Sequence, residues 1–170
     1  DKNGVWAKQG QVNQVLLTQL LADEYFTLPF PKSTGREYFN LTWLTQKIEQ
    51  CDELNSLVPA QDVQATLTRF TAITIVNDIK FLANKGKVYL CGGGAHNQQL
   101  VCDIEQLLLC NNSSVSFELL STLDKNIDGD LLEAIAFAWL AYAFDNKLPS
   151  NMPAVTGASM TCTLGTEFLP

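Results

Sequence analysis

The sequence predicts an α/β fold in which a small sheet is flanked by helices. Two short apolar runs, Val88–Cys91 and Val115–Leu119, have the length and composition of buried strands. Helical patterns surround them: a long amphipathic stretch that Pro59 opens precedes the first run, and Gln98–Leu109 lies between the two. The order helix, strand, helix, strand, helix is typical of an α/β arrangement.

The other helices are predicted from the spacing of apolar residues. Gln9–Leu21 carries apolar side chains at helical intervals, and a weaker pattern covers Thr42–Ile48. The apolar stripe that follows Pro59 continues to Leu82, and Gly86 is expected to end that helix.

The last predicted helix, Leu131–Phe144, is apolar nearly all round, which is typical of a central, buried helix. Trp139 and Tyr142 are therefore expected in the core rather than on a sugar-stacking surface. Glu133 is the one charge inside this helix, and burying a carboxylate without a partner is costly. Glu133 therefore either stabilises the positive end of the helix from its first turn or is directed into a polar site.

Composition restricts the classes of function. The 170 residues, about one domain in length, are 46% hydrophobic and 17% charged, which indicates a globular protein. Formal net charge is −7 and the Lys and Arg residues are scattered, so nucleic-acid binding is not expected. No signal peptide and no apolar run of transmembrane length is recognisable, so no membrane association is expected. Five cysteines in apolar surroundings, with no CxxC pair, predict buried, reduced thiols of a cytoplasmic protein rather than a metal site (Cys51, Cys91, Cys102, Cys110, Cys162).

The most informative segment is CGGGAHN at 91–97, which joins the first predicted strand to the next helix. Its glycines Gly92, Gly93 and Gly94 remove every Cβ from the turn, so a ligand could lie flat against backbone, and the helix offers N–H groups. The segment fits neither the dinucleotide fingerprint nor the Walker loop. It is therefore either a nucleotide shelf or a tight turn without a ligand. Asn97 bonds ribose or phosphate, caps the helix, or does both, and His96 only lines the entrance.

Five segments, in order along the chain, resemble the C-terminal half of the anhydro-N-acetylmuramic acid kinases, a family of bacterial sugar kinases. They are PKSTGREYF at 31–39, QATLT at 64–68, CGGGAHN at 91–97, EAIAFA at 133–138 and NMPAVTGA at 151–158. The resemblance implies one lobe of the two-lobed, ribonuclease-H-like fold of actin and hexokinase, which binds ATP between its lobes.

The resemblance also implies an activity. Such an enzyme hydrolyses the 1,6-anhydro bond of anhydro-N-acetylmuramic acid and phosphorylates the freed hydroxyl with ATP and Mg²⁺, giving N-acetylmuramic acid 6-phosphate in peptidoglycan recycling. By resemblance, Gly92, Gly93, Gly94 and Asn97 would bind the nucleotide and Glu133 would hold the sugar. A cytoplasmic homodimer is a further expectation.

Two parts of the family pattern do not occur in this sequence: the Gly-rich phosphate loop and the Asp-Thr-Gly-Pro-Gly-Asn stretch that carries the general base. Residues 1–170 are therefore expected to be a C-terminal lobe that lacks the N-terminal phosphate-binding lobe, with the general base upstream of Asp1. Alone, this fragment should be inactive and should expose an apolar face. The alternative is a non-catalytic nucleotide-binding or interaction module of the same fold. The loop Lys32–Arg36 either meets a ligand or is purely structural.

Overall fold

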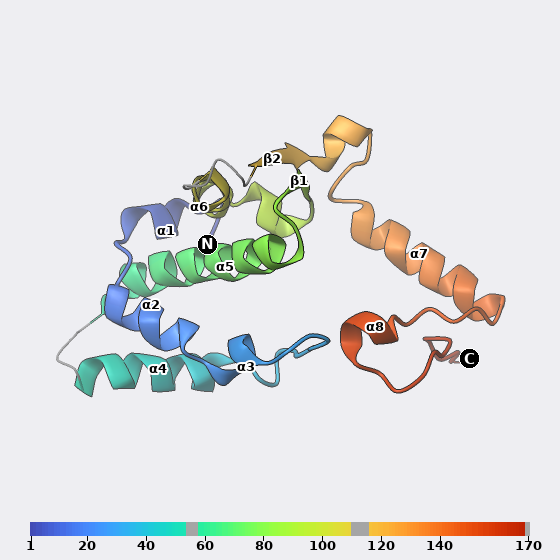
Figure 1. Cartoon of the computed structure of the whole chain (residues 1–170), viewed down its shortest axis with the longest axis horizontal. Coiled ribbons are helices and arrows are strands. Elements are labelled where there is room, and N and C mark those ends of the chain that lie inside the picture. Colours follow the sequence, from blue (N-terminus) through green and yellow to red (C-terminus); the bar gives the residue numbers. More distant parts are fainter. Residues whose placement is uncertain (54–57, 110–115, 169–170) are drawn as a thin grey trace.

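A computed structural model describes residues 1–53, 58–109 and 116–168. Strands β1 (Lys85–Leu90) and β2 (Ser116–Ser121) pair in parallel along their whole length. Helix α6 (Gln98–Leu109) lies between them in sequence and packs against the long helix α5 (Ala60–Leu82) (Figure 1). The predicted mixed α/β fold with a small sheet and flanking helices is confirmed. Val115, the first residue of the second predicted strand, lies outside the described residues.

Helix α5 is the spine shared by two apolar clusters. Around its first half, Leu16, Leu20 and Phe70 form the centre of one cluster. Around its second half, Val76 packs with Ile104 beneath the sheet. Full burial of each such side chain stabilises the fold by about 1.5–3 kcal/mol. The helices that join α5 in the first half are α1 (Val5–Gln9), α2 (Gln14–Leu21) and α4 (Leu41–Glu53).

Short helical turns connect the larger elements. They are α3 (Glu24–Thr27), η1 (Gly93–His96), η2 (Thr122–Lys125) and α8 (Pro153–Thr156). Of these, η1 follows β1 and η2 follows β2, so both lie at the carboxyl ends of the parallel strands.

The single helix predicted over Gln9–Leu21 is wrong, because the chain forms α1 and α2 with a break at Gly10. A Cβ at Gly10 would collide with the backbone of Gln61 in α5, so this glycine permits close packing of two segments. Asn13 then begins α2, its side chain accepting a hydrogen bond from Leu16 N at 2.9 Å.

Further boundaries differ from expectation: β1 starts three residues before the predicted Val88–Cys91 and ends one residue earlier, at Leu90, and β2 ends two residues after the predicted Leu119. Helix α5 ends at Leu82, the next residue, Ala83, has an extended backbone, and Gly86 lies within β1 rather than at the end of the helix. Helix α4 is longer than the predicted Thr42–Ile48.

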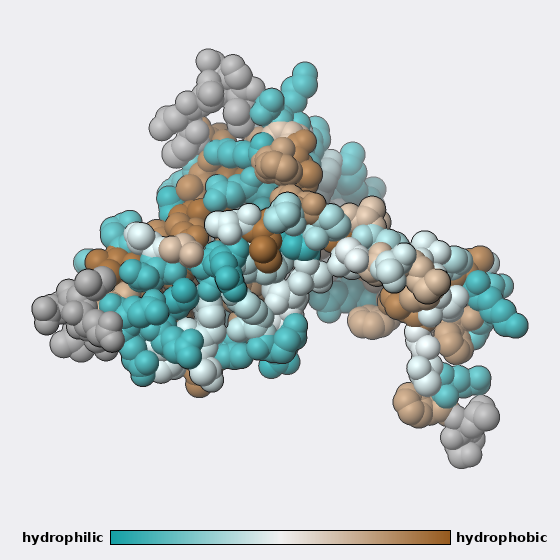
Figure 2. Space-filling model, turned by 60° about the horizontal axis from the view of Figure 1, so that its bottom comes forward, coloured by the Kyte–Doolittle hydropathy of each residue, from teal (hydrophilic) through white to brown (hydrophobic). Residues whose placement is uncertain are grey.

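Helix α7 (Leu132–Asp145) is not the buried central helix that its composition predicts. Only Ala143 is buried, whereas Trp139 and Tyr142 are 50% and 59% exposed, so their assignment to the core is wrong. The helix extends away from the main body, and no described element packs extensively against it (Figure 1). Figure 2 shows hydrophobic residues on the surface of this arm. Most of the apolar side chains of α7 therefore lack a covering layer within the described ranges.

The thiols are less buried than expected. Cys51 is buried, but Cys91, Cys102 and Cys162 are exposed free thiols, and Cys110 lies outside the described residues. None of the helices in the described ranges has both the length and the apolar composition needed to cross a bilayer.

Candidate functional site

The Gly turn, defined as Gly92–Gly94, begins where β1 ends. Gly92 has φ +71°, a backbone conformation that favours glycine. Gly93 and Gly94 lie outside that region of φ and open the short helix η1. A Cβ added at Gly93 would meet no atom within 4 Å, and one at Gly94 would make only an ordinary contact with Leu100. The positive φ therefore explains why position 92 is glycine. Neither backbone conformation nor packing explains why position 93 is glycine.

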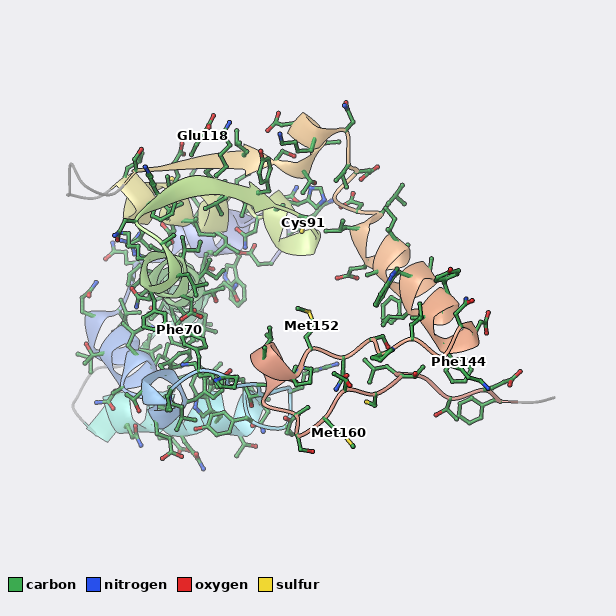
Figure 3. The ribbon with its side chains drawn as sticks, turned by 45° about the vertical axis from the view of Figure 1, so that its right-hand side comes forward. Phe70, Cys91, Glu118, Phe144, Met152 and Met160 are labelled. Atoms are coloured by element: carbon green, nitrogen blue, oxygen red, sulfur yellow. The ribbon has the colours of Figure 1, made fainter. Side chains whose placement is uncertain are left out.

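A small cavity of about 110 Å³ lies beside this turn, between the carboxyl ends of the two strands. Open α/β sheets bind ligands at this edge. Figure 3 shows Cys91 at the end of β1, next to the route that the chain takes toward α7. The lining residues are Leu90, Cys91, Gly92, Ala95, His96, Ser121, Thr122, Leu123, Asp128, Gly129 and Asp130.

One ion pair forms part of the wall of this cavity. His96 Nε2 lies 2.7 Å from Asp130 Oδ1, and both side chains are more than half exposed. The hydrogen bond with Asp130, followed by the charges of Asp130 and Asp128, raises the pKa of His96 above its ordinary value. His96 is the one basic side chain among the cavity's lining residues in the described ranges. The cavity thus has two carboxylates, Asp128 and Asp130, and the one basic group among its described residues, His96, is already paired with Asp130. This charge balance favours an uncharged ligand group here over a phosphate chain.

Asn97 caps α6, as one of its two predicted roles required. Its Oδ1 accepts a hydrogen bond from Leu100 N at 3.0 Å. Gln98 N donates to Asn3 O at 3.2 Å, and η1, which begins inside the Gly turn at Gly93, ends at His96 just before α6. The expectation that this helix offers free N–H groups to a ligand is therefore wrong for Gln98 and Leu100. A contact between Asn97 and nucleotide stays a prediction.

Glu133 is exposed and lies in the first turn of α7. Its carboxylate therefore has no burial cost, and its position suits the positive end of the helix. Among the described residues it makes no hydrogen bond or ion pair, and it does not line the cavity. Glu133 follows Asp130 by three residues, so the chain places it near the cavity's edge.

The loop Lys32–Arg36 is anchored internally at its start. Lys32 Nζ donates to the backbone carbonyls of Tyr25 at 3.1 Å and Phe26 at 3.3 Å, and lies 5.0 Å from the centre of the Tyr25 ring. These contacts favour the structural interpretation for Lys32.

Sequence reasoning missed Thr122, Asp128 and Gly129 as neighbours of the Gly turn. Thr122 Oγ1 is buried without a hydrogen-bond partner and lies 3.1 Å from the position that a Cβ at Gly129 would take. No pattern in the sequence marks these residues, because their proximity arises from the pairing of β1 with β2. Within the described residues, no group of three or more His, Cys, Asp or Glu side chains converges in a way that could hold a metal ion.

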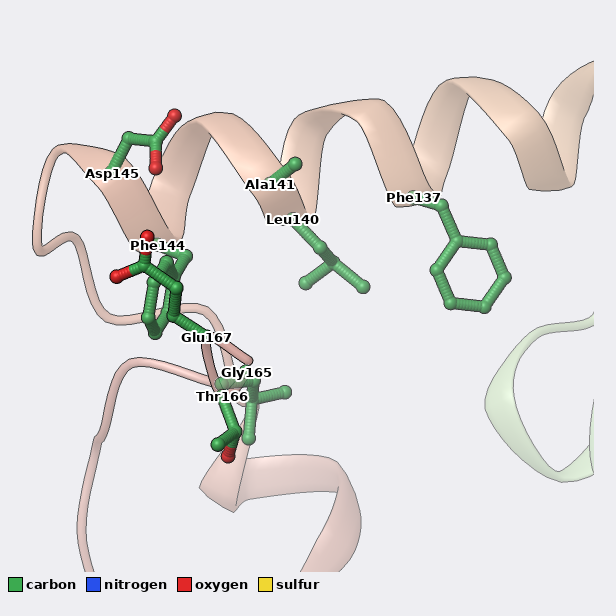
Figure 4. Close-up of a pocket in the computed structure, with 9 residues that line it drawn as sticks. Phe137, Leu140, Ala141, Phe144, Asp145, Gly165, Thr166 and Glu167 are labelled. Atoms are coloured by element: carbon green, nitrogen blue, oxygen red, sulfur yellow. The ribbon is translucent and has the colours of Figure 1, made fainter. Parts of the chain in front are cut away.

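A second, larger cavity of about 520 Å³ lies between α7 and the segment that follows α8. Figure 4 shows Leu140 and Phe144 of α7 facing this cavity, with Gly165, Thr166 and Glu167 on the opposite side. Its lining is largely apolar and includes none of the sequence-predicted site residues.

Comparison with known proteins places the chain in a family. A model of the anhydro-N-acetylmuramic acid kinase family matches residues 1–170. Curated relatives of that name include proteins of Colwellia psychrerythraea, 52% identical over 100% of this chain and 44% of the relative, and of Photobacterium profundum, 45% identical over 99% and 44%. The protein of Aliivibrio fischeri is 50% identical over 99% of this chain and 43% of its own length. The chain thus spans less than half the length of these relatives. With the whole chain matched, it belongs to the anhydro-N-acetylmuramic acid kinase family.

Proposed function

We propose that residues 1–170 are the C-terminal lobe of an actin-like, two-lobed anhydro-N-acetylmuramic acid kinase. The intact enzyme, a cytoplasmic homodimer, would use ATP to hydrolyse the 1,6-anhydro bond and phosphorylate the freed hydroxyl, giving N-acetylmuramic acid 6-phosphate for peptidoglycan recycling. Family membership and the greater length of the relatives support this proposal. The phosphate-binding loop and the general base would come from the other lobe, so this chain alone would be inactive.

Gly93 carries the nucleotide part of the proposal. Its backbone does not need glycine, and a side chain there would enter empty space. A ligand that lies flat against the turn would occupy that space and would account for the missing side chain. The position beyond the carboxyl ends of parallel strands suits nucleotide binding in α/β folds.

The charges of the cavity determine which half of ATP fits. The carboxylates of Asp128 and Asp130 would repel phosphates, so the adenosine half would lie on the Gly turn and Asn97 would contact the ribose. The described residues do not fit a Mg²⁺ site, so Mg²⁺ would accompany the phosphates toward the other lobe.

Glu133 would hold the sugar. Its carboxylate is exposed and without a partner among the described residues, which leaves it able to accept hydrogen bonds from sugar hydroxyls. Because α7 starts directly after the segment that lines the cavity, sugar and nucleotide would lie on neighbouring parts of the lobe.

The decisive substitution is Gly93→Val in the intact enzyme. A branched side chain would fill the space that adenosine needs, and should weaken ATP binding by about tenfold or more. Sugar binding and the fold should be unaffected, because the new Cβ meets no protein atom within 4 Å. Calorimetric titration with ATP and with sugar measures both affinities.

Gly86→Val is the matched control. Gly86 lies in β1, and a Cβ there would meet only the Phe117 ring, at 4.0 Å. Equal ATP affinity in the Gly93→Val, Gly86→Val and unaltered enzymes would refute the nucleotide site. Loss of ATP binding in Gly93→Val alone, with no phosphorylated sugar formed by the unaltered protein, would favour the non-catalytic module.

A further inference from the structure

The segment Asp128–Asp130 contacts the Gly turn and leads directly into α7. Gly92 N donates to Gly129 O at 3.3 Å, and a Cβ at Gly129 would lie 3.4 Å from Cys91 Cα. Asp128 Oδ1 accepts a hydrogen bond from Asp130 N at 2.9 Å, which fixes the backbone around Asp130. The segment is therefore packed and hydrogen-bonded against the end of β1.

His96, which also lines the cavity, bonds to this segment. It is the last residue of η1, and its Nε2 lies 2.7 Å from Asp130 Oδ1. Helix α7 begins two residues after Asp130, and no described element packs extensively against it. The Gly92–Gly129 hydrogen bond and the His96–Asp130 pair therefore tie the chain just before α7 to the residues of the Gly turn and η1.

We propose that His96 and Asp130 are a positioning pair that couples nucleotide on the Gly turn to sugar at Glu133. The inference rests on the proposed function of these two sites. A nucleotide that settles on the turn shifts η1, and the ion pair transmits the shift through Asp130 to the first turn of α7. Coupling of this kind is reciprocal, so bound sugar strengthens nucleotide binding by the same factor.

The proposal predicts a pH dependence with a definite sign. The charged groups that face the His96 ring are Asp130 and Asp128, and both favour the protonated imidazole. The pKa of His96 is raised from 6.5, so the imidazole is mostly protonated at pH 6 and the ion pair is lost as the pH rises through the raised value. Coupling should therefore be stronger at pH 6 than at pH 8.5.

The test measures the affinity of the intact enzyme for an ATP analogue with a non-transferable γ-phosphate, with and without saturating sugar. The ratio of the two dissociation constants is the coupling factor. At pH 6, His96→Ala and Asp130→Ala should each lower it by about two- to fivefold, the range expected for an exposed ion pair. The double variant should lower it no further. His96→Lys should keep the coupling at pH 8.5, because lysine stays protonated there.

The Lys87–Glu118 pair supplies the control. It joins β1 to β2 at 3.1 Å with similar exposure, but neither residue lines the cavity. Lys87→Ala should leave the coupling factor unchanged, and thermal unfolding confirms that every variant folds. Absence of coupling in the unaltered enzyme, equal coupling at both pH values, or unchanged coupling in His96→Ala would overturn the inference. Gly93→Val separates the two proposals: if it impairs ATP binding while coupling survives His96→Ala, only the positioning pair is wrong.

Discussion

Asp23→Asn should destabilise the chain more than any exposed acidic substitution. Asp23 is 6% exposed and accepts three hydrogen bonds: from Trp43 Nε1 at 2.8 Å, from the Tyr38 hydroxyl at 2.9 Å and from Tyr25 N at 3.1 Å. Lys47 Nζ lies 3.5 Å from the same carboxylate. The carboxylate thus joins α3 and α4 to the loop that contains Tyr38 and resembles the family segment at 31–39.

The loss of folding free energy expected for Asp23→Asn follows from these contacts. Asparagine keeps the shape of aspartate but has an NH₂ group in place of one acceptor oxygen. In either orientation of the amide, this NH₂ group faces a buried donor, and that donor loses its acceptor. Losing a charge-assisted hydrogen bond of this kind costs about 1.5–3 kcal/mol. For a chain of this size, that cost lowers the melting temperature by about 3–12 °C. Thermal and urea unfolding of the 170-residue chain measure it, with Glu118→Gln on the exposed Lys87–Glu118 pair as control.

The destabilisation by Asp23→Asn should also depend on pH. Burial alone would raise the pKa of Asp23, but the hydrogen bonds from Trp43, Tyr38 and Tyr25 N, together with Lys47, lower it below 3.8. A lowered folded-state pKa contributes stability above the unfolded-state value, and this contribution is lost as the pH falls through the folded-state value. The difference between the unaltered chain and Asp23→Asn should therefore shrink below about pH 4. A difference that stays constant down to pH 2, or one no larger than that of Glu118→Gln, would refute the reasoning.

Three further predictions concern α7 and its surroundings. Glu133→Gln should lower turnover of the intact enzyme by about ten- to a hundredfold at unchanged melting temperature, whereas a lowered melting temperature with normal kinetics would indicate a helix-start role alone. The isolated chain should self-associate through the apolar surface of α7, and Phe137→Ser should reduce this; light scattering that finds only monomer at high concentration contradicts it. Gly129→Ala should cost about 1–3 kcal/mol in thermal unfolding, because its Cβ would lie 3.1 Å from Thr122 Oγ1.

Local patterns were sufficient for the α/β unit. The bounds predicted for Gln98–Leu109 agree with α6, because the apolar spacing lies within the segment and the cap, Asn97, directly precedes it. The break at Gly10 was missed because its cause lies in α5, where Gln61 passes too close for a Cβ. A periodic pattern contains no information about such a distant neighbour.

Burial was predicted less well than secondary structure. The apolar composition of α7 correctly indicates a helix, but burial depends on what covers it, and no described element does so. Cys91 shows the same limitation: it follows an apolar strand but lies at the strand's open end, where its thiol is exposed.

The parts of the candidate site that consist of residues adjacent in sequence could be predicted. The parts whose residues are distant in sequence and meet only in the fold could not. The Gly turn is visible in sequence because three glycines in a row are unusual in a strand-to-helix connection. The His96–Asp130 pair is not, because its partners are 34 residues apart and meet only through the parallel pairing of β1 and β2. Thr122 and Gly129 are hidden in the same way, because both are far from the Gly turn along the chain and reach it only through the fold.

The glycines of this region have different physical causes, and this decides which of them can test function. Gly92 is explained by its positive φ and Gly129 by close packing, so replacing either would strain the fold and confound a loss of binding. Gly93 has ordinary φ and open space around its Cβ position, so a side chain there should leave the fold unchanged. A loss of ATP affinity in Gly93→Val would therefore report on the ligand rather than on the protein's stability.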